Sequence, residues 1–455
     1  MNSSCDLIVR GATLVLPSGL VRADLAIDGG KIAKIGPDLG FDARETIDAS
    51  GLHVIAGIID SHVHFNQPGR TDWEGLRSGS SALAAGGGTA FFDMPLNSLP
   101  PVINAESVAL KLAAAERESL TDFAIWGGLV PGNVEHLGPM AEAGVIGFKS
   151  FMCNSGVDEF QRADPGTLKV GMKRAAELGM LVAVHAEDED LARVRTAEAH
   201  ARGSDVRTWL TARPVELELE AIRTAVDIAG ETGCALHIVH VSSPEGVALA
   251  REARDRGADV SIETCPHYLL LTDQDVVRLG APAKCFPPLR SESQRLGLWG
   301  ALEAGKIDTV GSDHSPAPPD MKRSADFFLN WGGISGCQHG FGLLVSEALS
   351  RKPAAEVLPQ LSELLSGNVA RRFRINRTKG QLAEGLDADL TLISLGTPHM
   401  LSNADLLYRH RQGPYDGRKS AVTIDRTVVR GRTVFSAGRI APAGASVHFI
   451  RPYSG

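Results

Sequence analysis

Short apolar runs alternate with helical patterns through the middle of this chain, and few folds accommodate that rhythm. The eight runs are Val54–Asp60, Thr89–Met94, Phe123–Leu129, Val145–Lys149, Leu181–His185, Ala235–His240, Asp259–Thr264 and Asp308–Gly311. The intervening helical patterns include Trp73–Ala85, Glu106–Glu118, Thr167–Leu178, Pro214–Glu231, Glu245–Arg256 and Ser291–Glu303. Eight strands alternating with helices favour an α/β fold, a TIM-type (β/α)8 barrel, over an open sheet.

The two ends of the chain have a different rhythm, of short strands separated by turns. The N-terminal strands are expected at Asp6–Arg10, Thr13–Leu16, Ala23–Asp28 and Lys31–Ile35. After a helical stretch at Ala355–Phe373, further strands are expected at Asp387–Ile393, Ala421–Val429 and Thr433–Ser436. We therefore expect one small β domain built from residues 1–53 and 376–455, with the barrel over residues 54–375.

Composition excludes several classes of protein. Hydrophobic residues make up 43% of the 455 residues and charged residues 22%, a balance typical of a globular chain with a large core. No run approaches the ~18 apolar residues that a membrane helix needs. The net charge of −8 and the lack of a long basic run argue against nucleic acid or an anionic membrane as partners.

The cysteines and the N-terminus indicate a cytoplasmic protein. The six cysteines are scattered without a Cys-x-x-Cys pair, and a chain of this length does not need disulfides. The first residues, MNSSCDLIVRG, lack the basic and apolar regions of a secretion signal. We expect free thiols in a reducing compartment.

The sharpest local motif is Asp60-Ser61-His62-Val63-His64, which closes the first expected barrel strand. Side chains two apart on a strand face the same way, so His62 and His64 can bind one ion together. Taken alone, the pair is more typical of two surface histidines than of a metal site.

Similar polar residues close other expected strands. Lys149 ends the fourth, His185 the fifth and His240 the sixth, and Asp313 follows the eighth. Because the carboxyl ends of barrel strands open on one face, these side chains should converge at a single mouth. Convergence makes a set of unrelated polar strand ends an improbable alternative.

Imidazole and carboxylate ligands suit zinc and similar divalent ions, and four histidines exceed what one catalytic zinc usually takes. The sequence therefore predicts a centre with two metals. An ammonium at Lys149 would repel both ions, whereas a lysine carboxylated by CO2 would be an anion able to bridge them. The sequence by itself does not reveal that modification.

Other conspicuous residues have simpler interpretations. His237 precedes His240 by three positions, so packing on the other face of the strand is more probable than ligation. His267 and His314 lie just beyond strands seven and eight, where contact with substrate or with a ligand is as probable as a structural role. Gly86-Gly87-Gly88 precedes a strand rather than a helix and is not interpreted as a phosphate loop.

Together, Asp-x-His-x-His, Gly-Phe-Lys, the two later histidines and Ser-Asp-His resemble the cyclic amidohydrolases, which include dihydropyrimidinases, hydantoinases, allantoinases and dihydroorotases. The resemblance covers essentially the whole chain. It implies a barrel enzyme with two metals, usually zinc, a carboxylated Lys149, and a small β-sandwich domain formed from both termini. It also implies a homotetramer. In such an enzyme His62, His64 and Asp313 would bind one metal, and His185 and His240 the other.

Motifs outside the metal ligands point to the allantoinase branch. The stretch from Gln67 to Gly75, the Met94-Pro-Leu-Asn97 motif, the segment from Ser312 to Lys322 and Trp331-Gly-Gly-Ile-Ser-Gly336 resemble allantoinases. So do the stretches from His240 to Gly246 and from Tyr408 to Arg418. Hydantoinases stay a live alternative, because Trp126-Gly-Gly-Leu-Val-Pro-Gly-Asn133 and Gly147-Phe-Lys-Ser150 resemble some of them.

Departures from the other branches favour the same choice. Dihydroorotases carry an arginine where this chain has Asn66, and dihydropyrimidinases carry a tyrosine where it has Asn154 and a serine where it has Phe286. The expected reaction is hydrolysis of the hydantoin-ring amide of allantoin to allantoate, with a hydantoinase or dihydropyrimidinase-type hydrolase as the alternative.

The expected roles follow from these positions. Asp313 would accept the proton of the attacking water and pass it to the leaving ring nitrogen. Asn154 or backbone N–H groups would help to stabilise the oxyanion, since the family's tyrosine is absent. Arg70 and Asn97 follow the first two barrel strands and would contact the substrate or order loops, and Phe286 is a further candidate contact.

Overall fold

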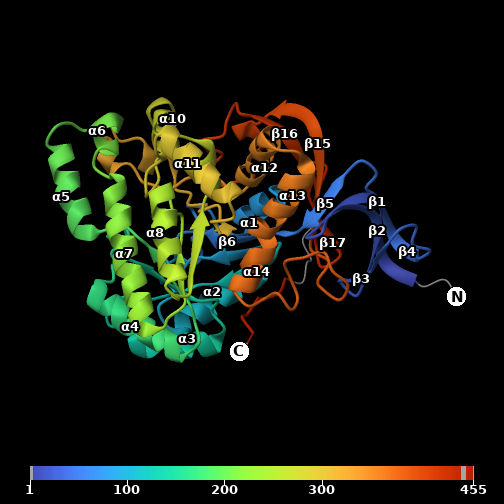
Figure 1. Ribbon diagram of the computed structural model, residues 1–455, viewed down its shortest axis with the longest axis horizontal. Helices are drawn as coiled ribbons and strands as arrows, with labels where there is room; N and C mark the ends of the chain where they lie inside the picture. The colour runs from blue at the N-terminus through green and yellow to red at the C-terminus, as the bar shows by residue number, and fades with distance from the viewer. Residues whose placement is uncertain (1–3, 442–446, 454–455) are drawn as a thin grey trace.

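The computed structural model describes residues 4–441 and 447–453. Figure 1 shows a barrel surrounded by helices and, beside it, a β-rich domain that holds the N-terminus. The predicted α/β architecture is confirmed: parallel strands form the barrel, and strands from both ends of the chain form the second domain.

The barrel has eight strand positions. Its strands are β6 (Ile58–Val63), β7 (Gly88–Asp93), β8 (Asp122–Ile125) with its continuation β9 (Gly127–Gly128), β10 (Phe148–Phe151), β11 (Val182–His185), β12 (Leu236–Ile238), β13 (Val260–Thr264) and β14 (Thr309–Val310). Two parallel sheets, β6-β7-β8 and β9 to β14, meet to close it. Ile146 N–H donates to Ile125 O at one seam, and His64 N–H donates to His314 O at the other.

Helices follow the strands and cover the barrel from outside. They are α1 (Leu76–Ala85), α2 (Ala105–Glu118), α3 (Leu137–Ala143), α4 (Pro165–Glu177), α5 (Glu189–His200), α6 (Val206–Leu210), α7 (Val215–Thr232), α8 (Pro244–Asp255), α9 (Pro266–Leu270), α10 (Asp273–Leu279), α11 (Glu292–Glu303), α12 (Gly340–Arg351), α13 (Ala354–Ser362) and α14 (Asn368–Arg372). The helical patterns named from the sequence do not include α3, α5, α6, α9, α10 or α12.

Local sequence explains where these helices begin. At α8 the Ser243 hydroxyl accepts a hydrogen bond from Gly246 N–H, and Pro244 takes the first helical position, where no N–H is needed. At α4 Asp164 caps Thr167 N–H in the same way, again with a proline at the first position. The expected helix over Ala355–Phe373 is present but is divided by a π turn at Glu363–Gly367.

The β-rich domain is one hydrogen-bonded sheet of nine strands. From the N-terminal end come β1 (Ser4–Leu16), β2 (Gly19–Asp28), β3 (Lys31–Gly36), β4 (Asp42–Asp48) and β5 (His53–Ala56); from the C-terminal end come β15 (Leu390–Met400), β16 (Lys419–Val429), β17 (Arg432–Ser436) and β18 (Arg439–Ile440). The two sets join where β15 pairs with β5. Apolar side chains from both sets share one core.

One expected strand is two strands in the structure. The run Val54–Asp60 divides at Gly57, so that β5 belongs to the β-rich domain and β6 to the barrel. Gly57 N–H donates to Asp389 O at 2.8 Å, and a Cβ at this position would lie only 2.3 Å from Thr89 Oγ1. The chain therefore changes domain where the side chain of Thr89 lies too close for any residue larger than glycine.

A group of ion pairs joins the barrel to the β-rich domain at the amino-terminal ends of the barrel strands. Lys379 Nζ lies 2.7 Å from Asp122, 2.6 Å from Asp389 and 3.1 Å from Asp387, and Arg430 Nε lies 3.1 Å from Asp122. We call these five residues the junction cluster. Asp122 begins β8, so the cluster lies at the opposite end of the barrel from the carboxyl ends of the strands.

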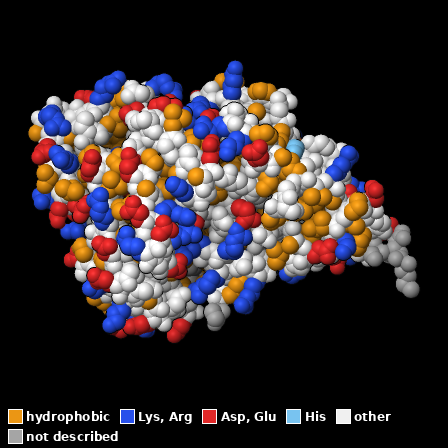
Figure 2. Space-filling model, in the orientation of Figure 1, with side chains coloured by type: hydrophobic (Ala, Val, Ile, Leu, Met, Phe, Trp, Pro, Cys, Tyr) orange, Lys and Arg blue, Asp and Glu red, His pale blue; other side chains and the backbone are white. Residues whose placement is uncertain are grey.

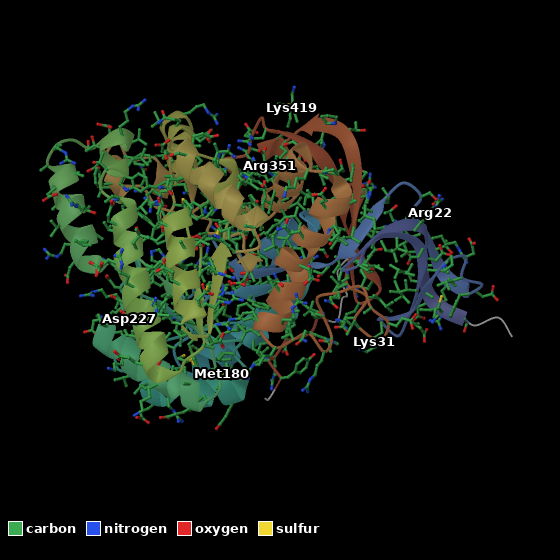
Figure 3. The ribbon with its side chains drawn as sticks, viewed as in Figure 1. Arg22, Lys31, Met180, Asp227, Arg351 and Lys419 are labelled. Atoms are coloured by element: carbon green, nitrogen blue, oxygen red, sulfur yellow. The ribbon has the colours of Figure 1, made fainter. Side chains whose placement is uncertain are left out.

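The outer surface is charged and mixed. On the face in Figure 2, acidic and basic side chains are interspersed, without one sign dominating. Figure 3 shows side chains filling the space between helices and strands, with Met180, just before β11, at the lower end of the barrel. Among the described residues, no helix combines the length and the apolar character needed to cross a bilayer.

Candidate metal centre

Two histidines and an aspartate from opposite ends of the sequence meet at the barrel mouth. His62 lies near the end of β6, His64 follows it, and Asp313 follows β14. Asp313 Oδ1 is 3.3 Å from His62 Nε2 and 3.3 Å from His64 Nε2. One potential ligand atom from each residue lies within 4.8 Å of the other two, which is close enough to share an ion.

The other two predicted histidines lie beside this group. The rings of His185 and His240 are 4.5 Å apart, and the ring of His240 is 5.5 Å from that of His62. All four imidazoles are at least nine-tenths buried, and burial lowers the pKa of His64, His185 and His240. Buried neutral imidazoles offer lone pairs, which is the form that a metal binds.

Lys149 on β10 lies among them as a buried amine. Within the described part of the chain its Nζ has no hydrogen-bond partner, and it lies 4.6 Å from the centre of the Phe151 ring. Burial lowers the pKa of Lys149 to about 7, against the opposing attraction of Asp313 and Glu263. We call His62, His64, Lys149, His185, His240 and Asp313 the candidate metal cluster.

Backbone conformation at the cluster is strained. His240 and Asp313 have φ angles of +43° and +45°, in the left-handed region that residues with side chains seldom adopt. Such angles persist where the surrounding structure requires them, and they are concentrated at functional sites. Here these angles turn the side chains of His240, which follows β12, and Asp313, which follows β14, into the barrel mouth.

Glu263 on β13 orients His62, and the sequence analysis did not identify it. His62 Nδ1 lies 2.9 Å from Glu263 Oε1, and Ser61 Oγ donates to Glu263 Oε2 at 2.6 Å. Because an ionised carboxylate only accepts, His62 Nδ1 donates to Glu263, and its Nε2 faces Asp313. A carboxylate that holds Nδ1 in this way leaves Nε2 as the ring atom that can bind a metal.

Glu187 holds His185 in a similar way, and it was also missed. His185 Nε2 lies 2.9 Å from Glu187 Oε2, to which Arg213 also donates at 3.0 Å. His185 therefore has Nδ1 available for a ligand. The sequence offers one signal for each of these two glutamates. Glu187 lies two residues after His185, and Glu263 is an acidic residue inside an otherwise buried strand.

The cluster opens into two adjoining pockets. The first is lined by His62, His64, Leu96, Asn97, Phe151, Ser155, His185, His240, Phe286, Asp313, Ser315, Trp331, Gly332 and Gly333. The second has a volume of about 400 Å³ and adds Cys153, Asn154, Gly156, Glu187, Arg213, Phe328, Leu329 and Asn330. Both are mixed in character, which suits a small polar ring compound.

Three of the four predicted substrate contacts lie in these pockets. Asn97 has an unpartnered Oδ1 and lies 3.5 Å from His64 Nδ1 through its Nδ2. Phe286 lines both pockets, and Asn154 lines the second, with its Oδ1 accepting from Gly156 N–H. Arg70 lines neither pocket: it donates to Asn97 O and Glu159, which orders the loops at the mouth.

Three other buried histidines, His267, His314 and His237, differ in their surroundings. His267 is fully buried near Asp313 with both ring nitrogens unpartnered, and burial lowers its pKa to about 4. His314 accepts from Gly336 N–H and packs on Tyr408, which is a structural role. His237 is fully buried and lies 3.4 Å from Glu263, so it supports the residue that orients His62.

Comparisons with known proteins agree with this geometry. Residues 53–434 match the model of the amidohydrolase family. An allantoinase from Rubrobacter xylanophilus is 51% identical over 99% of this chain and 98% of its own, and one from Solibacter usitatus is 50% identical over 96% and 94%. The structure of an L-hydantoinase from Arthrobacter aurescens has a TM-score of 0.93 at 33% identity, covering 96% of this chain and 98% of its own.

Proposed function

The chain belongs to the amidohydrolase family and is a cyclic amide hydrolase, and we propose that its substrate is allantoin, whose hydantoin-ring amide it hydrolyses to allantoate. The supporting observation is that relatives called allantoinase are 39–51% identical over nearly the whole chain, whereas the hydantoinase structure is 33% identical. The open pocket with Asn97 and Asn154 at its wall suits a substrate that carries a polar ureido group.

We propose two divalent metal ions, zinc by ligand type, at the candidate metal cluster. His62, His64 and Asp313 would hold one ion and His185 and His240 the other, with Lys149 contributing to both. The donor set fits: the imidazoles are buried, Glu263 and Glu187 orient two of them, and Lys149 Nζ and His240 Nδ1 have no partner within the described residues.

We propose that Lys149 is carboxylated. The neutral amine attacks CO2, a new N–C bond forms, and one proton is released, which leaves a carbamate anion at Nζ. The proposal is supported by the full burial of Lys149 beside four buried imidazoles and a carboxylate, where an ammonium would oppose a second cation. Replacing the amine by an anion reverses that repulsion.

Bound metals would supply polarisation of the amide carbonyl and neutralise negative charge. The residues supply the proton transfer: neighbouring His62 and His64 outweigh burial and lower the pKa of Asp313 to about 2, so it is a carboxylate that can accept a proton from water at Oδ2. Asp313 then returns this proton to the ring nitrogen as the C–N bond breaks. Asn97, Asn154 and Phe286 would position the ring, and Arg70 would hold the loop that carries Asn97.

The assembly and compartment are proposals as well. We propose a cytoplasmic homotetramer, on the resemblance to the cyclic amidohydrolases and on six cysteines that are all buried and unpaired. Size-exclusion chromatography with light scattering would measure the mass of the assembly.

A turnover panel on metal-replete protein tests the substrate. It should contain allantoin, hydantoin, 5-substituted hydantoins, dihydrouracil and dihydroorotate. We expect kcat/KM for allantoin to exceed the others by at least ~100-fold, equivalent to ~2.7 kcal/mol of transition-state discrimination. Preference for substituted hydantoins would overturn allantoin as the substrate and favour a hydantoinase.

The carboxylated lysine has its own test. Lys149→Ala should lose activity and most bound metal, and added short-chain carboxylates should restore part of the activity because they supply the missing anion. Full metal occupancy in the folded variant, measured by elemental analysis, would contradict the bridging role. In the unmodified protein, incorporation of ¹³CO2 should give a carbamate signal by NMR.

A further inference from the structure

We propose that Lys284 and Lys322 are positioning residues for the substrate pocket: two buried ammonium groups fix the backbone of the segment from Phe327 to Gly333, and thereby set the affinity and choice of cyclic amide. We call this segment the pocket wall. The inference deepens the proposed function, since it concerns the specificity of the same site, and it rests on that function only for its kinetic test.

Lys284 binds the first half of the pocket wall. Its Nζ donates to the carbonyls of Phe327 at 2.7 Å, Phe328 at 3.1 Å and Asn330 at 2.6 Å. Three aromatic rings surround the same ammonium at 5.1–5.5 Å: Trp209, Phe286 and Phe327. One lysine thus uses all three N–H bonds on a single irregular turn.

Lys322 binds the second half from the other side. Its Nζ donates to Trp331 O at 3.2 Å, Gly333 O at 2.7 Å and Ala281 O at 3.2 Å. Ala281 and Lys284 lie in the same short stretch, and Gly333 N–H donates to Lys284 O at 2.7 Å. The pocket wall is therefore tied at both ends to the segment that carries Phe286.

Neither ammonium has a carboxylate partner in the part of the chain that the structure describes. Lys284 is fully buried and Lys322 is 9% exposed, and burial lowers the pKa of each to about 7. A buried charge of this kind is stabilised only by the dipoles that it contacts. If the pocket wall moved, both lysines would lose carbonyl acceptors without gaining water, so the wall is held in one conformation.

The pocket wall forms one side of the substrate site. Trp331, Gly332 and Gly333 line the pocket at the metal cluster, and Phe328 to Gly332 line its outer part. Gly332 packs directly on Phe286, where a Cβ would lie 2.4 Å from the ring. The Phe286 ring is in turn held between Arg213, at 4.5 Å, and Lys284.

Methionine substitutions test the proposal, since methionine fills similar space without charge or donors. Lys284→Met and Lys322→Met should each raise KM for allantoin about tenfold and lower its preference over unsubstituted hydantoin, with kcat within about threefold, because ground-state and transition-state binding are lost together. The matched control is Lys169→Met, at a surface lysine that pairs with Glu231. Unchanged KM and preference in folded Lys284→Met and Lys322→Met would overturn the proposal.

A spectroscopic readout is independent of the substrate. In protein labelled with 5-fluorotryptophan, the ¹⁹F resonance of Trp331, assigned with Trp331→Phe, should shift and broaden in both lysine variants and stay in place in the control. An unmoved resonance would contradict positioning. If the wild type does not hydrolyse allantoin at all, the proposed function fails, but this measurement still decides whether the lysines fix the wall.

Hydrogen exchange in the unmodified protein covers the case in which both variants fail to fold. Trp331 N–H donates to Met321 O at 2.8 Å and Gly333 N–H to Lys284 O. If the wall is fixed, both amides should exchange as slowly as those of the barrel strands. Exchange of both amides as fast as in exposed loops would overturn the proposal.

Discussion

Two buried groups of charged and ionisable residues, at opposite ends of one barrel, solve the same electrostatic problem differently. The candidate metal cluster and the junction cluster each bring three potential metal ligands within 4.8 Å of one another: His62, His64 and Asp313 in one, Asp122, Asp387 and Asp389 in the other. In the junction cluster the chain supplies its own cations, Lys379 and Arg430. The metal cluster has imidazoles and an unpartnered amine instead.

The difference shows in the charged state of each lysine. Three carboxylates hold the pKa of Lys379 well above its usual range although burial by itself lowers it, whereas burial dominates at Lys149 and lowers its pKa. Lys379, which is paired with three carboxylates, has a structural role: it joins the barrel to the β-rich domain. At the candidate metal cluster the described residues supply no such partner for Lys149, which is the arrangement expected of a site that binds external cations.

The largest expected effect comes from removing the proton acceptor of the metal cluster. Asp313→Asn should lower kcat by about 10²–10⁴-fold while the fold survives, since the side chain keeps its size but can no longer accept a proton. The measurement is allantoin turnover with circular dichroism as the check on folding. The control is Asp320→Asn, an exposed carboxylate in the same loop that pairs with Arg323. Appreciable activity in folded, metal-loaded Asp313→Asn would refute its role as the base.

The junction cluster should give the opposite result. Lys379→Met would leave two buried carboxylates, Asp122 and Asp389, and the half-buried Asp387 with less compensation, so we expect the free energy of unfolding to fall by about 3–5 kcal/mol. Turnover per folded molecule should stay unchanged, because the cluster lies at the other end of the barrel. Denaturant unfolding measures the loss. Lys31→Met, which removes an exposed partner of Asp387, should cost under ~1 kcal/mol. Equal losses would remove the distinction between a buried joint and a surface pair.

An intermediate effect is expected at the residue that orients His62. Glu263→Gln should weaken metal affinity about 10–100-fold, because the amide no longer holds the His62 proton on Nδ1. Competition with a chelator of known affinity measures this change. Glu218→Gln is the matched control: Glu218 is also buried and hydrogen-bonded, but to Ser242 and Ser243 rather than to a histidine. A similar loss of metal affinity in both variants would mean that general destabilisation is the cause.

The smallest expected effect is a difference in how the stability contributed by each end of the barrel depends on pH. Burial lowers the pKa of His267 to about 4, so between pH 4 and 6.5 the unfolded chain binds a proton that the folded chain does not. Stability should therefore rise with pH across this window, by at most about 1.4 kcal/mol per pH unit from this residue. The comparison is unfolding of metal-free wild type and His267→Gln, whose slope should be flatter. In the junction cluster, Lys379 and Arg430 outweigh burial and lower the pKa of Asp122, so this carboxylate stays ionised across the same pH window. Equal slopes would exclude His267 as a source of the pH dependence.

The sequence predicts the fold, and the residues that it assigns to the candidate metal cluster do lie together at the barrel mouth, both for local reasons. Each barrel strand is visible in the sequence as an apolar run. The run that forms β11 ends at His185, and the strand ends at the same residue. Sequence could not show that Val54–Asp60 divides at Gly57, because the division depends on Thr89, a residue of another strand. Nor could it distinguish Arg70, which holds loops, from Asn97, which lines the pocket.

The amino-acid sequence by itself therefore determined the alternation of elements and the residues at each strand end, since periodicity and strand termini are properties of neighbouring positions. Tertiary structure alone decided which polar groups were paired. Glu263 and Glu187 became orienting residues, Lys379 a joint and Lys284 and Lys322 supports of the pocket wall because side chains distant in sequence met there. Whether a buried charge finds a partner depends on through-space distance, which no local pattern encodes.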